Sequence, residues 1–157
     1  MIALLTRVVK ICWFDDPQHQ TIAYDLQEFL KQSLSHCFIG VLALEQLIVE
    51  MGYATKGRTL IQTRRISISF RDKSLLELFK LALTLVRELH LKLSAATQMG
   101  PKEELSLMAD VMLHALRLAH KAMTFEFSGV LLDETIEDSN TVQFPLTWRD
   151  TMQDEKT

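Results

Sequence analysis

The feature that most constrains this 157-residue chain is a long segment, residues 75–93, whose apolar residues recur at helical spacing on more than one face. A helix with one apolar stripe buries one side, so a helix with two must pack on two sides. The main stripe comprises Leu75, Leu78, Phe79, Ala82, Leu85, Val86 and Leu89, and a second face carries Leu76, Leu83 and Leu93. The pattern therefore predicts a helix that has both a partner and a further neighbour.

A second segment, residues 102–124, has the same two-faced character. Pro101 suits a first helical position, and Glu103 and Glu104 favour the positive end of a helix dipole. One stripe contains Leu105, Met108, Met112, Ala115, Ala119 and Ala122, and the other contains Leu107, Val111 and Leu118. We expect this segment to pair with residues 75–93.

Earlier in the chain, apolar periodicity predicts three more helices, over residues 2–13, 20–34 and 37–51. The last two are joined by a short connection, as in an antiparallel pair. Residues 125–149 predict a long irregular loop, and no second domain is expected within residues 1–157. Paired helices with two apolar faces are typical of stacked helical repeats, although a compact helical bundle satisfies the same periodicity.

The stretch SISFRDKSLLELF, residues 67–79, changes from an alternating pattern to a leucine-rich one. Ser74 and Glu77 have the S-x-x-E spacing of a capping box, in which each side chain binds an amide of the first helical turn. The spacing predicts that a helix begins at Leu75. Residues 67–72 would then connect two helix pairs, with Phe70 packed under the following helix.

Charge is distributed unevenly along the chain. The net charge of −3 and the pI near 5.9 argue against a general nucleic-acid binder, which needs a surplus of Lys and Arg. Residues 56–73, however, carry six basic side chains against one acid, and residues 133–157 carry seven acids against two basic side chains. Such charged runs occur in linkers that their charge keeps solvated, and they also occur on surfaces that bind a partner. The candidate residues for a partner surface are Arg58, Arg64, Arg65 and Arg71, of which Arg71 also fits a local salt bridge.

Signatures of catalysis, metal binding and cofactor binding are absent from the sequence. Cys12 and Cys37 stand among apolar neighbours and indicate a reducing compartment. Asp110 and His114 lie four residues apart, but no third ligand is spaced to join them on a metal, so we interpret them as a surface pair. No apolar run approaches the ~18 residues of a membrane span, so membrane insertion is not expected.

Several blocks carry a resemblance to a known family. These blocks are CWFDD, CFIGVLALEQL, RRISISFRDKSLLELFKLA and MTFEFSGVLLDETIEDSNTVQFPLTWRD. In order and spacing they resemble the exportin-7 branch of the importin-beta superfamily, from about Ile2 to Asp150. The most specific are SFRDKSL, the F-x-F-x-G-x-x-x-D-E-T run and TVQFPLTWR. The loop from Gly52 to Gln62 is shorter than in that family.

The resemblance implies an all-α fold in which antiparallel helix pairs stack as a segment of a HEAT-repeat solenoid, internal to the N-terminal half of a longer receptor. It implies protein export from the nucleus, governed by the GTP-bound state of Ran, without catalysis or a cofactor. The implied partners are Ran, protein cargo and nuclear pore proteins, and the implied location is nucleus and cytoplasm. No contact residue is carried over. The alternative is a stand-alone helical scaffold or adaptor that does not bind Ran.

Overall fold

The computed structural model describes residues 1–54, 57–96, 101–125 and 148–149. These ranges are helical almost throughout and contain no strand. The helices are α1 (Ile2–Ile11), a 3-10 turn (Pro17–Gln20), α2 (Ile22–Leu30), α3 (Leu34–Gly52), α4 (Leu60–Phe70), a π-helical turn (Arg71–Leu75), α5 (Leu76–Ala96) and α6 (Lys102–Met123). The predicted all-α class is confirmed.

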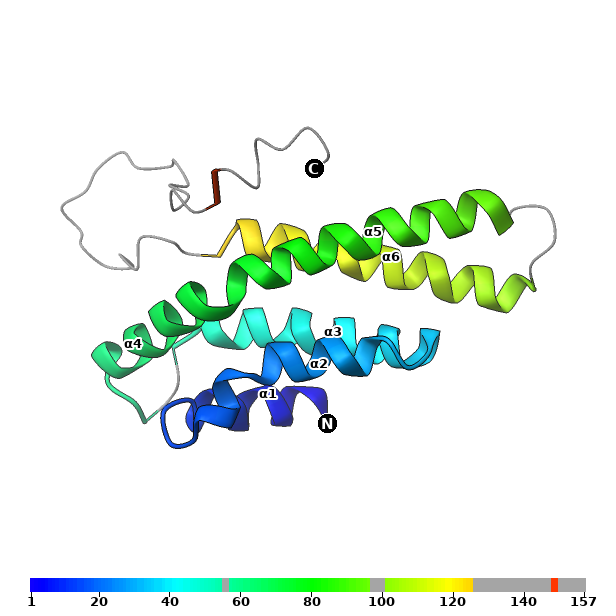
Figure 1. Ribbon diagram of the computed structural model, residues 1–157. Helices are drawn as coiled ribbons and strands as arrows, with labels where there is room; N and C mark the ends of the chain where they lie inside the picture. Colours follow the sequence, from blue (N-terminus) through cyan, green and yellow to red (C-terminus); the bar gives the residue numbers. More distant parts are fainter. Residues whose placement is uncertain (55–56, 97–100, 126–147, 150–157) are drawn as a thin grey trace.

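The helices form stacked antiparallel pairs. Helix α2 pairs with α3, and α5 pairs with α6. Helix α3 also packs against α6 on one side and against α1 on the other, so the order through the stack is α1, α3, α6 (Figure 1). Helix α6 therefore has a partner within its pair, α5, and a neighbour in the next pair, α3, as its two-faced stripe predicts.

Helix α3 lies at the centre of the stack, and this position explains why so many of its residues are apolar. Val41, Leu44, Leu47 and Met51 are buried, because α1, α2 and α6 all pack against this helix. By length and composition alone, α3 would also pass as a membrane span. Core helices share that composition, and the three packed neighbours account for it here. Gly40 allows α2 to come close, since an added Cβ would lie 2.6 Å from Leu30 Cδ2.

Helix boundaries differ from the predicted ranges where polar side chains bind the backbone. Ser33 accepts a hydrogen bond from the His36 amide at 3.3 Å, which starts α3 at Leu34 rather than at residue 37. Asp16 accepts one from the Gln18 amide at 2.9 Å and begins the 3-10 turn that precedes α2. The predicted irregular loop lies outside the described residues, apart from Phe125, Trp148 and Arg149.

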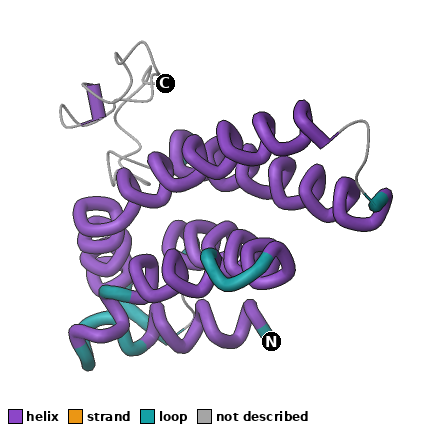
Figure 2. The backbone as a smooth tube through the Cα atoms, turned by 45° about the vertical axis from the view of Figure 1, so that its right-hand side comes forward, coloured by secondary structure: helices purple, strands orange, loops and turns teal. Residues whose placement is uncertain are grey.

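The predicted connection over residues 67–72 is instead part of a helix. Helix α4 passes directly through the π-helical turn into α5, and Figure 2 shows the backbone changing direction there. A π-helical turn is a common cause of a helix bend. Ser74 is buried inside this turn, and Glu77 forms an exposed ion pair with Lys80 at 3.1 Å. The predicted capping box and the predicted helix start at Leu75 are therefore wrong.

The capping box of this helix lies fifteen residues earlier. Thr59 Oγ1 accepts a hydrogen bond from the Gln62 amide at 3.2 Å, and the Gln62 side chain accepts one from the Thr59 amide at 3.2 Å. The spacing T-x-x-Q is visible in the sequence and is the signal that could have located this start.

The alternating stretch is helical because its inner side chains meet other helices. Ser67 Oγ donates to the Met51 carbonyl at 2.6 Å, at the end of α3. Ser69 Oγ accepts a hydrogen bond from Trp13 Nε1 at 3.0 Å. Phe70 is fully buried, as expected. The aromatic rings that it contacts are those of Trp13 and Phe125, each at a centroid distance of 5.8 Å.

Candidate interaction surface

The structure separates the four arginines of the predicted partner surface into two groups. Arg58 Nη2 donates to the Ile11 carbonyl, at the C-terminal end of α1. Arg71 Nε pairs with Asp72 Oδ1 at 2.7 Å, and the Arg71 side chain is only 21% exposed. These two side chains are engaged within the molecule. Arg64 and Arg65 lie on the exposed side of α4.

Lys10, which was not predicted from the sequence, has the same role as Arg58, since its side chain also donates to carbonyls at the end of another helix. Lys10 Nζ donates to the Glu50 carbonyl at 2.6 Å and to the Tyr53 carbonyl, at the C-terminal end of α3. Burial lowers the pKa of Lys10, while the charge of Glu50 opposes that effect. A cation at a helix C-terminus satisfies carbonyls that have no partner within the helix.

The exposed side of α4 combines aliphatic and basic residues. Ile61, Arg64, Arg65 and Ile68 follow the i, i+3, i+4, i+7 spacing, so they share one side of the helix. Ile61 is 74% exposed, and Ile68 is half-buried. The opposite side is buried through Thr63, Ile66 and Phe70.

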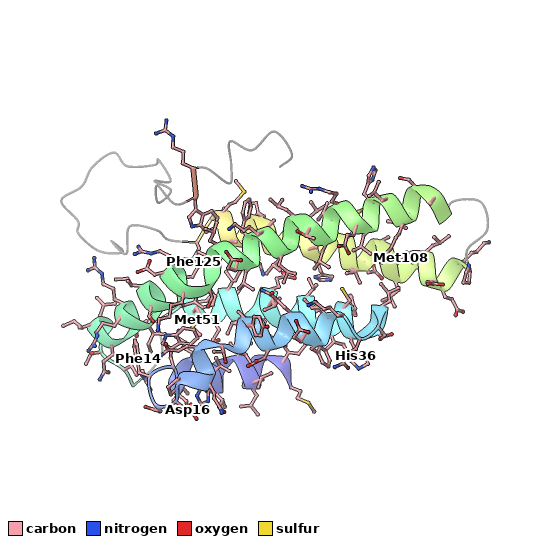
Figure 3. The ribbon with its side chains drawn as sticks, viewed as in Figure 1. Phe14, Asp16, His36, Met51, Met108 and Phe125 are labelled. Atoms are coloured by element: carbon pink, nitrogen blue, oxygen red, sulfur yellow. The ribbon has the colours of Figure 1, made fainter. Side chains whose placement is uncertain are left out.

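Phe14 extends this surface beyond α4. The Arg65 guanidinium carbon lies 5.8 Å from the centroid of the Phe14 ring, at cation–π distance, and Phe14 is 51% exposed. Figure 3 shows Phe14 beside α4, at the end of the molecule opposite Met108. We call the surface formed by Phe14, Ile61, Arg64, Arg65 and Ile68 the α4 face. The acidic side chains of residues 133–157 all lie outside the described ranges, which include only Trp148 and Arg149 of that segment.

A second polar cluster joins α3 to α6. Glu45 Oε2 lies 2.8 Å from His114 Nδ1, and Glu45 Oε1 lies 2.8 Å from Lys121 Nζ. Burial alone would raise the pKa of Glu45, but hydrogen bonds from Lys121 and His114 outweigh it, and the pKa is lowered. His114 thus contacts Glu45, and Asp110 is exposed. Among the described residues, no three His, Cys, Asp or Glu side chains gather as a metal site.

The two outermost helices of the stack expose apolar side chains. On α1, Leu4 is 68% exposed and Val8 is 45% exposed. On α6, Leu113 is 45% exposed and Leu116 is 48% exposed. Both helices therefore have an apolar outer face in addition to the face that packs against α3.

Several known proteins are similar to this chain over most or all of its length. The chain is 33% identical to Exportin-7-A of Xenopus laevis and 32% identical to Ran-binding protein 16 of Drosophila melanogaster, with 100% of the chain covered in each case. It is 32% identical to human Ran-binding protein 17 over 95% of its length. The chain spans about 14% of the length of these relatives.

Two other comparisons give no match. No protein-family model matches the chain, and no solved structure matches it significantly. The sequence similarity and the stacked helix pairs agree with each other. Along its whole length, the chain is homologous to a segment of the exportin-7 class of nuclear transport receptors.

Proposed function

We propose that this chain acts as one section of a Ran-GTP-dependent receptor that exports proteins from the nucleus through nuclear pores. The observation that carries the proposal is similarity along the whole chain to Exportin-7-A and Ran-binding protein 16, and along 95% of it to Ran-binding protein 17. The partners would be Ran, protein cargo and nuclear pore proteins. The receptor would shuttle between nucleus and cytoplasm and would catalyse no reaction.

The outer helices support a role within a larger stack. In helical-repeat proteins, a helix that ends the array needs a polar outer face. Helices α1 and α6 have apolar outer faces instead, with Leu4 and Leu116 about half exposed or more. In the proposed receptor, neighbouring repeats cover both faces. The contacts of α1 and α6 with α3 then make the packing continuous from one neighbouring repeat to the other.

Transport would require the complete receptor. Export couples the binding of cargo to the binding of GTP-bound Ran, and such coupling needs differential contacts in alternative states of the receptor. A section with two helix pairs encloses neither partner. We expect residual binding of Ran by the chain alone to be weaker than that of a full receptor by more than ~4 kcal/mol, the interval between nanomolar and micromolar affinity.

A chimaera tests the proposal directly. The homologous segment of Xenopus Exportin-7-A is replaced by this chain, and the affinity for Ran is measured with GTP and with GDP bound. We expect binding selective for the GTP form and export in permeabilised cells. A matched chimaera with Leu4→Glu and Leu116→Glu should lose both, because these charges fall between stacked repeats.

Two outcomes would contradict the proposal. The first is a folded chimaera that binds cargo but no longer distinguishes Ran-GTP from Ran-GDP, which would favour a scaffold role without Ran. The second is nanomolar, GTP-selective binding and cargo export by the 157-residue chain alone, which would show a complete receptor rather than a section of one.

A further inference from the structure

The α4 face is the part of the described surface where apolar exposure and uncompensated positive charge coincide. Ile61, at 74%, is the most exposed large apolar side chain in the described ranges apart from Met1. Its helix, α4, lies at one end of the molecule and projects beyond the stacked pairs (Figure 1). Its neighbours on the same side of the helix are the two arginines.

The arrangement of these side chains is specific. Residues 61 and 68 are seven apart, so their side chains follow one line along the helix, two turns from each other. Arg64 lies on one flank of this line, and Arg65 lies on the other. An aliphatic line with a guanidinium on each flank matches a polypeptide segment that has an aliphatic side chain between carboxylates.

The charges of the α4 face are not balanced within the described molecule. Arg64 makes no hydrogen bond, ion pair or ring contact with another described residue. Arg65 lies over the ring of Phe14, a contact that leaves the charge of its guanidinium uncancelled. Described residues 57–73 contain five basic side chains against Asp72, in a chain whose net charge is −3. The surface therefore attracts acidic groups locally, in contrast to the molecule as a whole.

We propose that the α4 face binds an acidic, amphipathic polypeptide segment. Aliphatic residues of the segment would contact Ile61, Ile68 and Phe14. Carboxylates would pair with Arg64 and Arg65, because the planar guanidinium matches a carboxylate with two parallel hydrogen bonds. Exposed isoleucines contribute nothing to phosphate binding, so this composition favours a protein segment over nucleic acid. The proposal concerns a surface on this chain and does not depend on Ran or transport.

Binding is measured by fluorescence anisotropy with the 157-residue chain and a labelled peptide in which Glu residues flank leucines at i and i+4 spacing. Arg64→Glu with Arg65→Glu should weaken binding by about tenfold or more, since each surface pair is worth up to ~1 kcal/mol and charge reversal makes it repulsive. Raising the salt concentration should weaken binding of the unaltered chain. Ile61→Asn should weaken binding severalfold without removing the salt dependence.

A control variant has the same change in charge at a distant place. Lys102→Glu with Arg117→Glu reverses two exposed cations on α6 and should leave peptide affinity within about twofold. Circular dichroism at 222 nm confirms that each variant remains helical.

Four results would overturn the proposal. Equal loss of affinity in the control variant would mean that only net charge matters. Tighter, Arg64- and Arg65-dependent binding of a single-stranded RNA 20-mer, or of phosphatidylserine vesicles, would assign the surface to another class of ligand. A tenfold gain in peptide affinity on neutralising the acids between residues 133 and 138 would show that this chain's own segment occupies the surface.

Discussion

Lys10 and Arg58 each bind the end of a helix to which they do not belong. Lys10, on α1, donates to carbonyls at the end of α3, and Arg58, which precedes α4, donates to a carbonyl at the end of α1. Only 1% of Lys10 is exposed. A buried lysine is stable here because its ammonium replaces lost water with hydrogen bonds to carbonyls. These contacts hold α1 beside α3, and the start of α4 beside the end of α1, through specific polar interactions.

Replacing Lys10 with methionine should destabilise the fold. Lys10→Met retains the apolar stem but leaves carbonyls of Glu50 and Tyr53 without their partner, at a cost of about 1–3 kcal/mol in the free energy of unfolding. Urea unfolding followed by circular dichroism measures the loss. Lys80→Met, on the exposed side of α5, should change stability by less than about 0.5 kcal/mol. Equal effects of the two substitutions would refute this role for Lys10.

The Glu45 cluster predicts how stability depends on pH. The pKa of Glu45 is lower in the folded chain than in the unfolded chain, so the folded state holds its proton less tightly. Its contribution to stability is complete above the unfolded pKa of ~4.3 and is lost as pH falls through the folded value. Between pH 5 and pH 3, the unaltered chain should therefore lose more stability than Glu45→Gln. Urea unfolding at a series of pH values checks this, and parallel curves would contradict it.

At the scale of elements, the continuous passage from α4 to α5 is the feature that organises the molecule. One helical segment begins at the Thr59 capping box, bends at the π-helical turn Arg71–Leu75 and continues as α5. The first part packs beside α1 and α3, and the second part pairs with α6. The bend allows a single segment to join two layers of the stack without an intervening loop.

Proline at residue 72 tests this continuity. Asp72→Pro should destabilise the chain by about 3 kcal/mol, because proline removes a backbone donor and collides with the preceding turn of a helix. Asp72→Ala is the matched control and should cost less than about 0.5 kcal/mol, since it removes only an exposed ion pair. Thermal or urea unfolding distinguishes them. A proline variant as stable as the alanine variant would mean that residues 71–75 behave as a loop.

At the scale of the whole molecule, the stack has one central helix and two apolar outer faces. Helix α3 packs against α1, α2, α4 and α6, whereas α1 and α6 each have an exposed apolar side. Exposed apolar faces of this kind favour association with another apolar surface.

The isolated 157-residue chain should therefore associate with itself. Leu4→Glu with Leu116→Glu should raise the dissociation constant by about tenfold or more, given the ~1.5–3 kcal/mol that burial of a leucine contributes. Sedimentation velocity over a range of concentrations measures the change. Tyr24→Glu with Leu91→Glu places two charges on α2 and α5, at sites that are 65% and 64% exposed, and should have a smaller effect. A monomeric unaltered chain at high concentration would disprove the prediction.

Apolar spacing was enough to predict the helical class and the pairing of the helices, and the quoted sequence blocks were enough to indicate the relationship to exportin-7. Apolar spacing in α5 and α6 requires packing on two sides, and this requirement is local enough to be visible in the chain. The tertiary structure decided the rest. Ser67 and Ser69 belong to a helix because their hydrogen-bond partners, Met51 and Trp13, are brought to them by α3 and α1.

The candidate partner surface was predicted only in part, because contacts between residues distant in the chain also decide which arginines are exposed. Sequence reasoning found the basic stretch, but only the fold shows that Arg58 and Arg71 are engaged internally while Arg64 and Arg65 face outward. His114 lies 69 residues from Glu45 along the chain and 2.8 Å from it in space. A repeating spacing can indicate which side of a helix is buried, but contacts between distant residues have no period. They are fixed only when the helices pack.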